Sequence, residues 1–284
     1  RQMCIRDRAR MKPALFDYIR AENREAVLEA LHAHGGAARI LSGGLSLLPM
    51  LNMRLATPEI ILDASRLTRG AAIQEEANQI VIEAGITQAK LLSWPGLGQH
   101  LPLFAKALPW VGHAQTRARG TICGSLAHAD PSAEIPLCVA VLGGRIELAS
   151  KRKARLISSA AFHIGMMQTE RRDDELLSRV LLPKAKPGEG YGFREYGRRH
   201  GDFAVAACAA KLVGKSITLG VAGVADVPTL RSWEALDGSA LDDALNEFAW
   251  SLGARADVHA DARMRRDLVR QLGRQAIDLS LIQN

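Results

Sequence analysis

Apolar residues recur at helical spacing in one N-terminal segment and form short runs on either side of it. The helical segment covers residues 24–34, where Asn23 is placed to cap the first turn and Gly35 to end the last. A further helix, capped by Ser46, is expected after a glycine turn. A β-α-β order of this kind is typical of a small α/β unit. The short apolar runs predict strands at residues 15–19, 38–41 and 59–62.

The middle of the chain carries signals for two hairpins and three helices. The stretch from Thr121 to Glu134 is rich in small and polar residues, and we expect a loop there. Alternating runs on either side of polar turns predict hairpin strands at residues 71–74, 79–83, 145–149 and 154–158. Helices are expected at about residues 88–92, 101–108 and 133–142.

Strands precede helices in the C-terminal part of the chain, which predicts an α+β arrangement there. Residues 184–190, KAKPGEG, lack large apolar side chains and are typical of a linker. Beyond the linker we expect strands at residues 203–213 and 216–224 and helices at about residues 240–252 and 264–281. The apolar stripe of the last helix is predicted to consist of Met264, Leu268, Leu272, Ala276 and Leu279. Four arginines lie off this stripe, namely Arg265, Arg266, Arg270 and Arg274.

The composition is that of a globular protein. With 284 residues, 48% apolar and 24% charged, the chain suits two domains or one large domain with a subdomain. This composition excludes a disordered tail, a collagen-like fibre and a disulfide scaffold. The apolar stretches are too short to cross a bilayer, so we expect no transmembrane segment. No CxxC pair or metal-ligand cluster is formed by the four cysteines, Cys4, Cys123, Cys138 and Cys208, and this favours a reducing cytoplasm.

The formal net charge of +7 is concentrated at the start of the chain. Residues 1–10 hold four Arg and one Asp, so they carry +3 of the +7 and leave +4 for the rest. They show no apolar period and no signal-peptide core, and Met11 is a natural start, so we interpret them as a non-native leader. A nucleic-acid-binding protein is the alternative that basic charge suggests. Aromatic platforms would support it, but only 5% of the residues are aromatic.

Three segments combine glycines with polar side chains. In the first, Gly43-Gly44, backbone N–H groups can face an anion such as phosphate, although a plain tight turn is the commoner explanation. The second runs from residue 119 to 131, and so many donors suggest a polar ligand. For two residues of this segment the alternative to a ligand contact is a structural role. His128 would then be a hydrogen-bonded structural residue, and Asp130 would cap the next helix. The third, residues 194–204, suggests either a salt-bridged turn between strands or a ligand contact.

Taken together, the three segments resemble the FAD-binding medium subunits of the molybdenum hydroxylases, the group of carbon monoxide dehydrogenase and xanthine dehydrogenase. The motifs of that family run roughly AGGxSLxPxxxxRL, RxRGTxGGSLAHADPxAE and RRxGDFA. The chain has SGGLSLLPMLNMRL from Ser42, RARGTICGSLAHADPSAE from Arg117 and RRHGDFA from Arg198. Order and spacing agree over residues 11–283, and two long motifs in register are far more specific than either glycine pair alone.

The resemblance implies an α+β fold. A two-subdomain FAD-binding domain of the vanillyl-alcohol oxidase or p-cresol methylhydroxylase (PCMH) type would be followed by a small α+β C-terminal domain. The FAD-binding domain would span residues 11–183, with subdomains at about 11–65 and 66–183. Residues 184–284 would form a C-terminal domain like that of carbon monoxide dehydrogenase flavoproteins.

The resemblance also implies which residues hold FAD. The first loop would bind the pyrophosphate, the second would wrap the flavin side, and Asp130 and Glu134 would contact polar parts of the cofactor. Val111 and Leu177 would pack near it, and Arg194 stands where the family often has Lys. The implied contacts are Ser42, Gly43, Gly44, Leu45, Ser46, Leu47, Val111, Thr121, Ile122, Cys123, Gly124, Ser125, Asp130, Glu134, Leu177 and Arg194.

Three of these residues depart from the family pattern. Leu45 replaces a frequent His or Gln, so one polar contact would be lost. Cys123 replaces a glycine, so the local backbone would shift and its thiol would lie near the flavin. Arg194 in place of Lys keeps the charge but changes the donor geometry.

By the same resemblance, the chain would be the electron outlet of a three-part oxidoreductase. A large molybdenum–pterin subunit would hydroxylate the substrate, a small subunit with two 2Fe-2S clusters would relay electrons, and FAD here would pass them to an external acceptor. The assembly would be a cytoplasmic dimer of heterotrimers. No residue of this chain would serve as a catalytic acid, base or nucleophile, or as a metal ligand. The alternative is a stand-alone FAD-dependent oxidoreductase. The sequence argues against it because it shows no cluster of residues that would activate a substrate.

Overall fold

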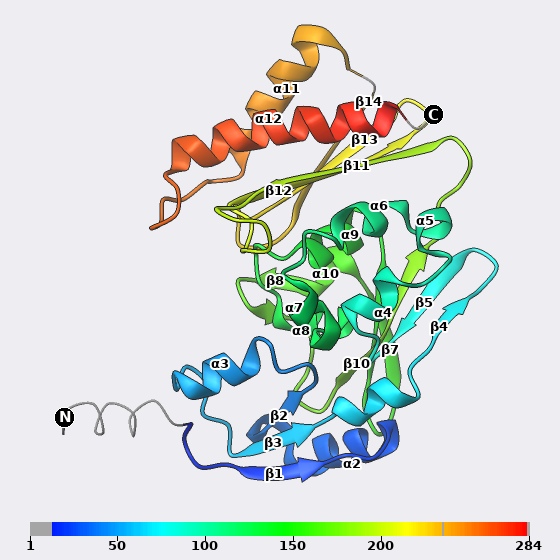
Figure 1. Ribbon diagram of the computed structural model, residues 1–284, viewed down its shortest axis with the longest axis vertical. Coiled ribbons are helices and arrows are strands. Elements are labelled where there is room, and N and C mark those ends of the chain that lie inside the picture. The colour runs from blue at the N-terminus through cyan, green and yellow to red at the C-terminus, as the bar shows by residue number, and fades with distance from the viewer. Residues whose placement is uncertain (1–12, 235, 283–284) are drawn as a thin grey trace.

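A computed structural model describes residues 13–234 and 236–282, in which three sheets follow one another along the long axis (Figure 1). The leader proposed at residues 1–10 lies outside the described residues. A three-stranded parallel sheet forms one end, and a five-stranded antiparallel sheet with its helices forms the middle. A four-stranded antiparallel sheet under two long helices forms the other end. This mixture of helix and strand is the expected α+β fold.

The parallel sheet begins the chain as the hydrophobic pattern predicts. Its strands run in the order β1-β3-β2, with β1 at Asp17–Arg20, β2 at Ala38–Leu41 and β3 at Ile60–Asp63. The connecting elements are α2 (Arg24–His34), η1 (Gly35–Ala37) and α3 (Leu47–Asn52). Asn23 caps α2, since its Oδ1 accepts from the Ala26 amide at 2.9 Å. Ser46 occupies the N-cap position of α3 as predicted, but its side chain makes no capping hydrogen bond.

The middle sheet has the order β4-β5-β10-β6-β7. Both predicted hairpins are confirmed, but the central strand β10 was not predicted. The strands are β4 (Ile73–Glu75), β5 (Gln79–Glu83), β6 (Arg145–Ala149), β7 (Ala154–Ser158) and β10 (Leu176–Pro183). The helices are η2 (Ser65–Arg69), α4 (Gln88–Leu92), α5 (Leu97–His100), α6 (Pro102–Ala107), α7 (Ala114–Arg119), α8 (Ile122–His128), α9 (Glu134–Val141) and α10 (Ser159–Phe162). A small hairpin adds β8 (His163–Gly165) and β9 (Gln168–Thr169).

The stretch from Thr121 to Glu134 is not the loop that its composition suggested, because α8 lies inside it. Thr121 Oγ1 accepts from the Gly124 amide at 3.0 Å and so caps the helix. Ile122 and Leu126 then fall on one face and are fully buried in the core of the middle part. A cap and two buried anchors outweigh the poor helix propensity of the glycine, serine and histidine between them.

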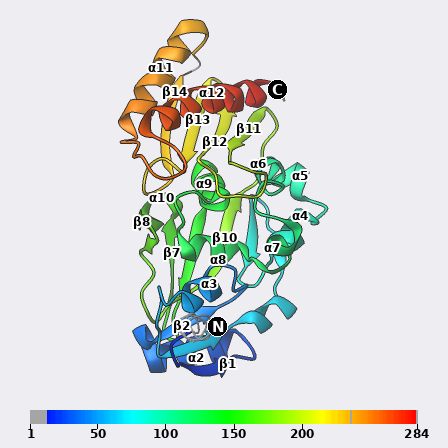
Figure 2. The same ribbon diagram turned by 60° about the vertical axis from the view of Figure 1, so that its left-hand side comes forward.

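The C-terminal sheet has the order β11-β12-β13-β14. Its strands are β11 (Glu189–Tyr196), β12 (Ala206–Val213), β13 (Ser216–Ala222) and β14 (Thr229–Glu234), and its helices are α11 (Gly238–Ser251) and α12 (Ala262–Leu281). Helix α12 crosses β11 closely: a Cβ on Gly192 would lie 2.7 Å from the Ala276 carbonyl carbon. Both views place α9 beneath this sheet (Figures 1 and 2).

The buried face of α12 differs from the predicted stripe. Arg265, expected off the stripe, is 6% exposed, because it donates to the Val205 carbonyl at 2.7 Å and to Asp257 at 2.5 Å. The face is rotated accordingly, and its buried members are Arg265, Val269, Leu272, Gly273, Ala276, Ile277 and Ser280. The predicted stripe members Met264, Leu268 and Leu279 are only partly buried.

The residues between β10 and β11 are tied to the middle part of the molecule. The predicted linker at residues 184–190 includes the first residues of β11, and the Ala185 amide donates to the His100 carbonyl at 2.9 Å. One apolar core includes Leu103 and Phe104 of α6 together with Tyr191 and Phe193 of β11. The C-terminal sheet therefore packs directly on the middle part. Within residues 13–234 and 236–282, no helix is long and apolar enough to cross a membrane.

Candidate functional site

The two long glycine motifs are far apart in sequence but lie against each other. A Cβ on Gly43 would stand 2.8 Å from the Arg119 carbonyl carbon and 3.0 Å from the Gly120 Cα, so only glycine allows this approach. Arg119 Nε donates to the Gly43 carbonyl at 3.2 Å, and the hydroxyl oxygens of Ser42 and Thr121 are 3.3 Å apart. The loop after β2 and the start of α8 thus form one continuous surface.

The first loop presents backbone donors. Gly44 has a φ of +80°, a conformation that glycine adopts without strain, and its carbonyl accepts from the Leu48 amide at 3.1 Å. The amides of Leu45, Ser46 and Leu47 lie before or at the first residue of α3, so they have no acceptor inside that helix. The side chain of Leu45 is 37% exposed. Such a group of amides is suited to an anion.

The second loop is fixed by backbone hydrogen bonds to the start of α4 and to the residues just before it. The Gln88 amide donates to the Gly120 carbonyl at 2.8 Å, and the Ile122 amide donates to the Ile86 carbonyl at 3.0 Å. Thr121 is 3% exposed and caps α8, whereas Ser125 is only partly buried. The loop is therefore rigid and holds the hydroxyl of Thr121 beside the first motif.

Cys123 does not point out of this loop. Its side chain is 5% exposed and belongs to the apolar core that also contains Ile122 and Leu126. Burial raises the pKa of its thiol to about 12. The thiol is therefore protonated at neutral pH and packs as a small apolar group.

Asp130 and Glu134 bracket the turn between α8 and α9. Asp130 Oδ1 accepts from the Ser132 amide at 2.8 Å, and the Asp130 carbonyl accepts from the Ala133 amide at 3.1 Å. Asp130 thus forms the turn that leads into α9, while Ala133 occupies the N-cap position. Glu134 is 6% exposed, and burial raises its pKa to about 7.

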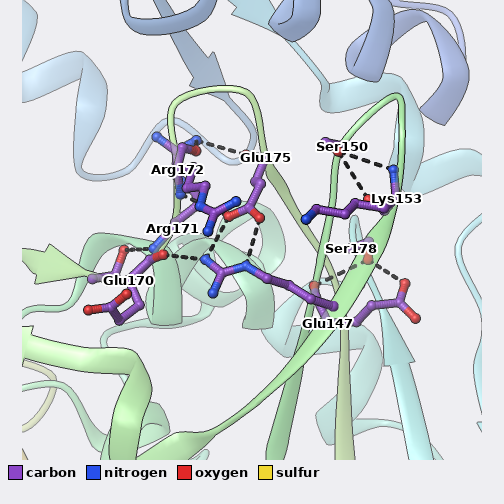
Figure 3. A network of polar contacts seen from close by, with 10 residues as sticks. Glu147, Ser150, Lys153, Glu170, Arg171, Arg172, Glu175 and Ser178 are labelled. Atoms are coloured by element: carbon purple, nitrogen blue, oxygen red, sulfur yellow. Dashed lines mark hydrogen bonds and ion pairs between the residues drawn. The ribbon is translucent and has the colours of Figure 1, made fainter.

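Val111 and Leu177 are buried in the same core as α8. Arg117 Nη1 donates to the Val111 carbonyl at 3.0 Å and to the Gly112 carbonyl at 2.8 Å, which holds the turn before α7. Leu177 belongs to β10. Figure 3 shows the polar contacts that anchor two residues close to it in the sequence, Glu175 just before the strand and Ser178 within it. Ser178 Oγ donates to Glu147 Oε1 at 2.6 Å. Glu175 Oε2 accepts from the Arg172 amide at 2.9 Å.

The pleat of β11 separates Arg194 from Glu195. Arg194 pairs with Cys208, which lies in the core under α11 and α12, whereas Glu195 pairs with Ala207, which lies in the core shared with the middle part. Directly paired residues share a face of the sheet. Arg194 is therefore on the face toward the helices, and the structure does not bring it together with the glycine motifs. Its contact with FAD stays a prediction.

The third motif is a tight turn beside Val111. Gly201 has a φ of +87° and approaches His113, and the rings of His200 and Trp110 lie 5.2 Å apart. The turn is closed by the Asp202 amide, which donates to the Arg199 carbonyl at 3.1 Å. Among the described residues no ion pair joins Asp202 to either neighbouring arginine, so the salt-bridged turn considered from the sequence is not what forms. A backbone hydrogen bond and a ring contact take its place.

Sequence reasoning missed two residues that shape the site. Arg119 was inside the quoted motif, but its bond to the Gly43 carbonyl depends on the fold. Gln88 is 6% exposed, and its side chain packs against Gly120 so closely that a Cβ there would collide with it. Its Oε1 atom has no hydrogen-bond partner. No local pattern distinguishes Gln88 from an ordinary helix residue.

Known proteins resemble this chain over most of its length. Residues 14–185 match the family described as the FAD binding domain in molybdopterin dehydrogenase. The chain is 37% identical over 199 residues to 6-hydroxypseudooxynicotine dehydrogenase complex subunit alpha of Paenarthrobacter nicotinovorans. This alignment covers 70% of the present chain and 67% of the relative. It is 31% identical over 280 residues to the carbon monoxide dehydrogenase medium chain of Afipia carboxidovorans, covering 94% and 97%. The solved structure of reconstituted carbon monoxide dehydrogenase from Oligotropha carboxidovorans matches with a TM-score of 0.91 at 30% identity, over 96% of this chain and 100% of that one.

Proposed function

The chain belongs to the FAD-binding medium subunits of the molybdenum hydroxylases, and we propose that it binds FAD between the loop after β2 and the start of α8. It is an oxidoreductase subunit, and its relatives are parts of multi-subunit enzymes. This favours the subunit role over a stand-alone oxidoreductase. The observation that carries the proposed site is the close approach of Gly43 to the backbone of residues 119 and 120.

The residues at this contact fit the pyrophosphate of FAD. A side chain on Gly43 would fill the space between the loops, and the amides of Leu45, Ser46 and Leu47 have no acceptor inside α3. The loop itself, residues 42–48, carries no acidic side chain that would repel a phosphate. Hydroxyls of Ser42 and Thr121 stand beside it, and the Gln88 Oε1 atom is a buried acceptor without a partner.

The roles of the chain's residues follow from this placement. Amides of the first loop bind the pyrophosphate, and Thr121, Gly124 and Ser125 border the cofactor on the α8 side. Val111 and Leu177 shape the apolar wall, and Asp130 and Glu134 lie at its polar end. When bound, FAD supplies the electron relay between the iron–sulfur clusters of a partner subunit and an external acceptor. The protein holds and orients the cofactor and needs no nucleophile of its own.

The proposed partners are a small iron–sulfur subunit and a large molybdenum–pterin subunit. Support comes from the relatives, one of which is by name a medium chain and another a subunit of a dehydrogenase complex. We place the complex in the cytoplasm as a dimer of heterotrimers. The thiols of Cys123, Cys138 and Cys208 are free and buried, which suits a reducing compartment.

The test is to express the chain alone and together with the neighbouring genes of its source. We expect the lone chain to bind one FAD with quenching of flavin fluorescence, and the co-expressed complex to contain iron and molybdenum as well. A folded chain that takes up no FAD would overturn the proposed function. A lone flavoprotein that oxidises a substrate without iron or molybdenum would support the stand-alone alternative instead.

A further inference from the structure

Arg119, the last residue of α7, holds Gly43 of the first loop from two sides. A Cβ on Gly43 would lie 2.8 Å from the Arg119 carbonyl carbon, so the two backbones are in close contact. The side chain reaches the same residue, because Arg119 Nε donates to the Gly43 carbonyl at 3.2 Å. This bond keeps the whole planar guanidinium group beside the first loop.

The guanidinium group is also close to the backbone donors of that loop. The amides of Leu45, Ser46 and Leu47 have no acceptor inside α3. Consecutive Cα atoms are about 3.8 Å apart, so the Cα atoms of Gly43 and Leu45 are at most about 7.6 Å apart. A diphosphate on these amides is therefore on the order of 10 Å or less from the guanidinium group, a distance at which 0.1 M salt leaves much of the attraction.

The positive charge of Arg119 is not neutralised by the part of the chain that the structure describes. The side chain is exposed, and no described carboxylate or carbonyl accepts from its Nη atoms. Neighbouring cations differ in this respect. Lys90 Nζ donates to the Ala71 carbonyl at 2.6 Å, and Arg117 Nη1 donates to carbonyls of the turn before α7. Arg119 is thus a cation held at the loop with donors to spare.

We propose that Arg119 binds the diphosphate of FAD through its Nη donors, while its Nε atom keeps the first loop in place. The proposal rests on FAD binding at the glycine motifs and assigns the charged group of that site. Residues 42–48 carry no charged side chain of their own, so their amides supply directed donors without a full positive charge. A guanidinium group supplies that charge together with paired N–H groups that match phosphate oxygens. Arg119 therefore favours a flavin that carries a diphosphate over riboflavin, which has no phosphate.

The main experiment measures the Kd for FAD by flavin fluorescence, using refolded apoprotein in KCl from about 50 to about 500 mM. In the wild type we expect the Kd to rise about fivefold over this range, because salt screens the attraction. Arg119→Gln removes the charge, so its Kd at low salt should be about 10- to 100-fold higher and should depend less on salt. Arg119→Lys keeps the charge without the planar fork, so we expect a smaller loss and the salt dependence of the wild type.

A role confined to holding Gly43 gives a different result. Removal of Arg119 would then weaken FAD binding without changing its salt dependence, and it would weaken riboflavin binding equally. Equal salt dependence in wild type and Arg119→Gln would therefore overturn the proposal, and so would an equal loss of affinity for FAD and riboflavin. We expect the Kd for riboflavin to change by less than about threefold in Arg119→Gln.

The matched control is Arg152→Gln, which removes the same charge from an exposed residue between β6 and β7. It should keep both the Kd and the salt dependence of the wild type. Thermal unfolding of each apoprotein checks that the variants are folded. If Arg119→Gln does not fold, the wild type still decides, because a Kd for FAD that does not rise with salt would overturn the proposal. A wild-type apoprotein that binds no FAD would instead overturn the proposed function itself.

Discussion

Replacing Gly43 by alanine is the sharpest test of the contact between the two motifs. The added Cβ would stand 2.8 Å from the Arg119 carbonyl carbon. Carbon atoms in contact are about 3.5 Å apart or more, so the loops must separate by roughly 0.7 Å. That shift lengthens the bond from Arg119 Nε to the Gly43 carbonyl, which is already 3.2 Å long, and the Ser42–Thr121 contact of 3.3 Å.

The cost can be estimated from these two effects. Forcing an extra methyl group into a packed contact costs about 1–3 kcal/mol, and losing one hydrogen bond costs about 1 kcal/mol more. The sum, about 2–4 kcal/mol, corresponds to roughly a 30- to 1000-fold loss of affinity if the loops must meet for FAD to bind. Because the first loop is at the surface, the apoprotein can relax by moving it. We therefore expect the effect to appear in FAD affinity more than in folding.

The assay is a fluorescence titration of apoprotein with FAD, paired with thermal unfolding of the apoprotein. Gly98→Ala is the matched control, because a Cβ on that exposed residue of α5 would meet no atom within 4 Å. The control should bind FAD as the wild type does. A Gly43→Ala protein that binds FAD within about threefold of the wild type would refute the view that this contact forms the cofactor site.

Three further predictions concern the surrounding structure. Gly192→Ala places a Cβ 2.7 Å from the Ala276 carbonyl carbon, so it should lower the free energy of unfolding by about 3 kcal/mol in urea, and an unchanged midpoint would contradict the packing of α12 on β11. Thr121→Val removes the oxygen that accepts from the Gly124 amide, so it should cost about 1 kcal/mol in the same assay, whereas Thr121→Ser should retain most of the stability. Burial raises the pKa of Cys123 to about 12, so iodoacetamide at pH 8 should not label it in the native protein, and mass spectrometry of its peptide should detect labelling only after denaturation.

Local pattern was sufficient where the determinants of an element lie within a few residues. Asn23 caps α2 through its own side chain, and both middle hairpins close through polar turns beside their strands. Helix α8 could not be recognised in this way, because it depends on the burial of Ile122 and Leu126 in a core assembled from distant segments. Composition alone therefore favoured a loop.

The same limit applies to α12 and to the candidate site. Arg265 belongs to the buried face of α12 only because carbonyls of Val205 and Gly223 receive its guanidinium, and no helical periodicity contains that information. The motifs did identify the two glycine loops, but their mutual contact needs the fold.

The two adjacent positions of the second glycine motif show how the fold decides which departure from a family pattern is tolerated. At Gly124 a Cβ would stand 2.6 Å from Thr121 Oγ1, the atom that accepts the amide of the same residue, so a side chain there would break the cap of α8. Cys123 instead has no positive φ, and its side chain enters the apolar core beside Leu126. A sulfur at that position fills space that glycine would leave empty and does not reach the loop surface. The backbone of the motif is therefore kept by Gly124 and Thr121, and the change at Cys123 falls on the side of the helix that faces away from the surface shared with Gly43.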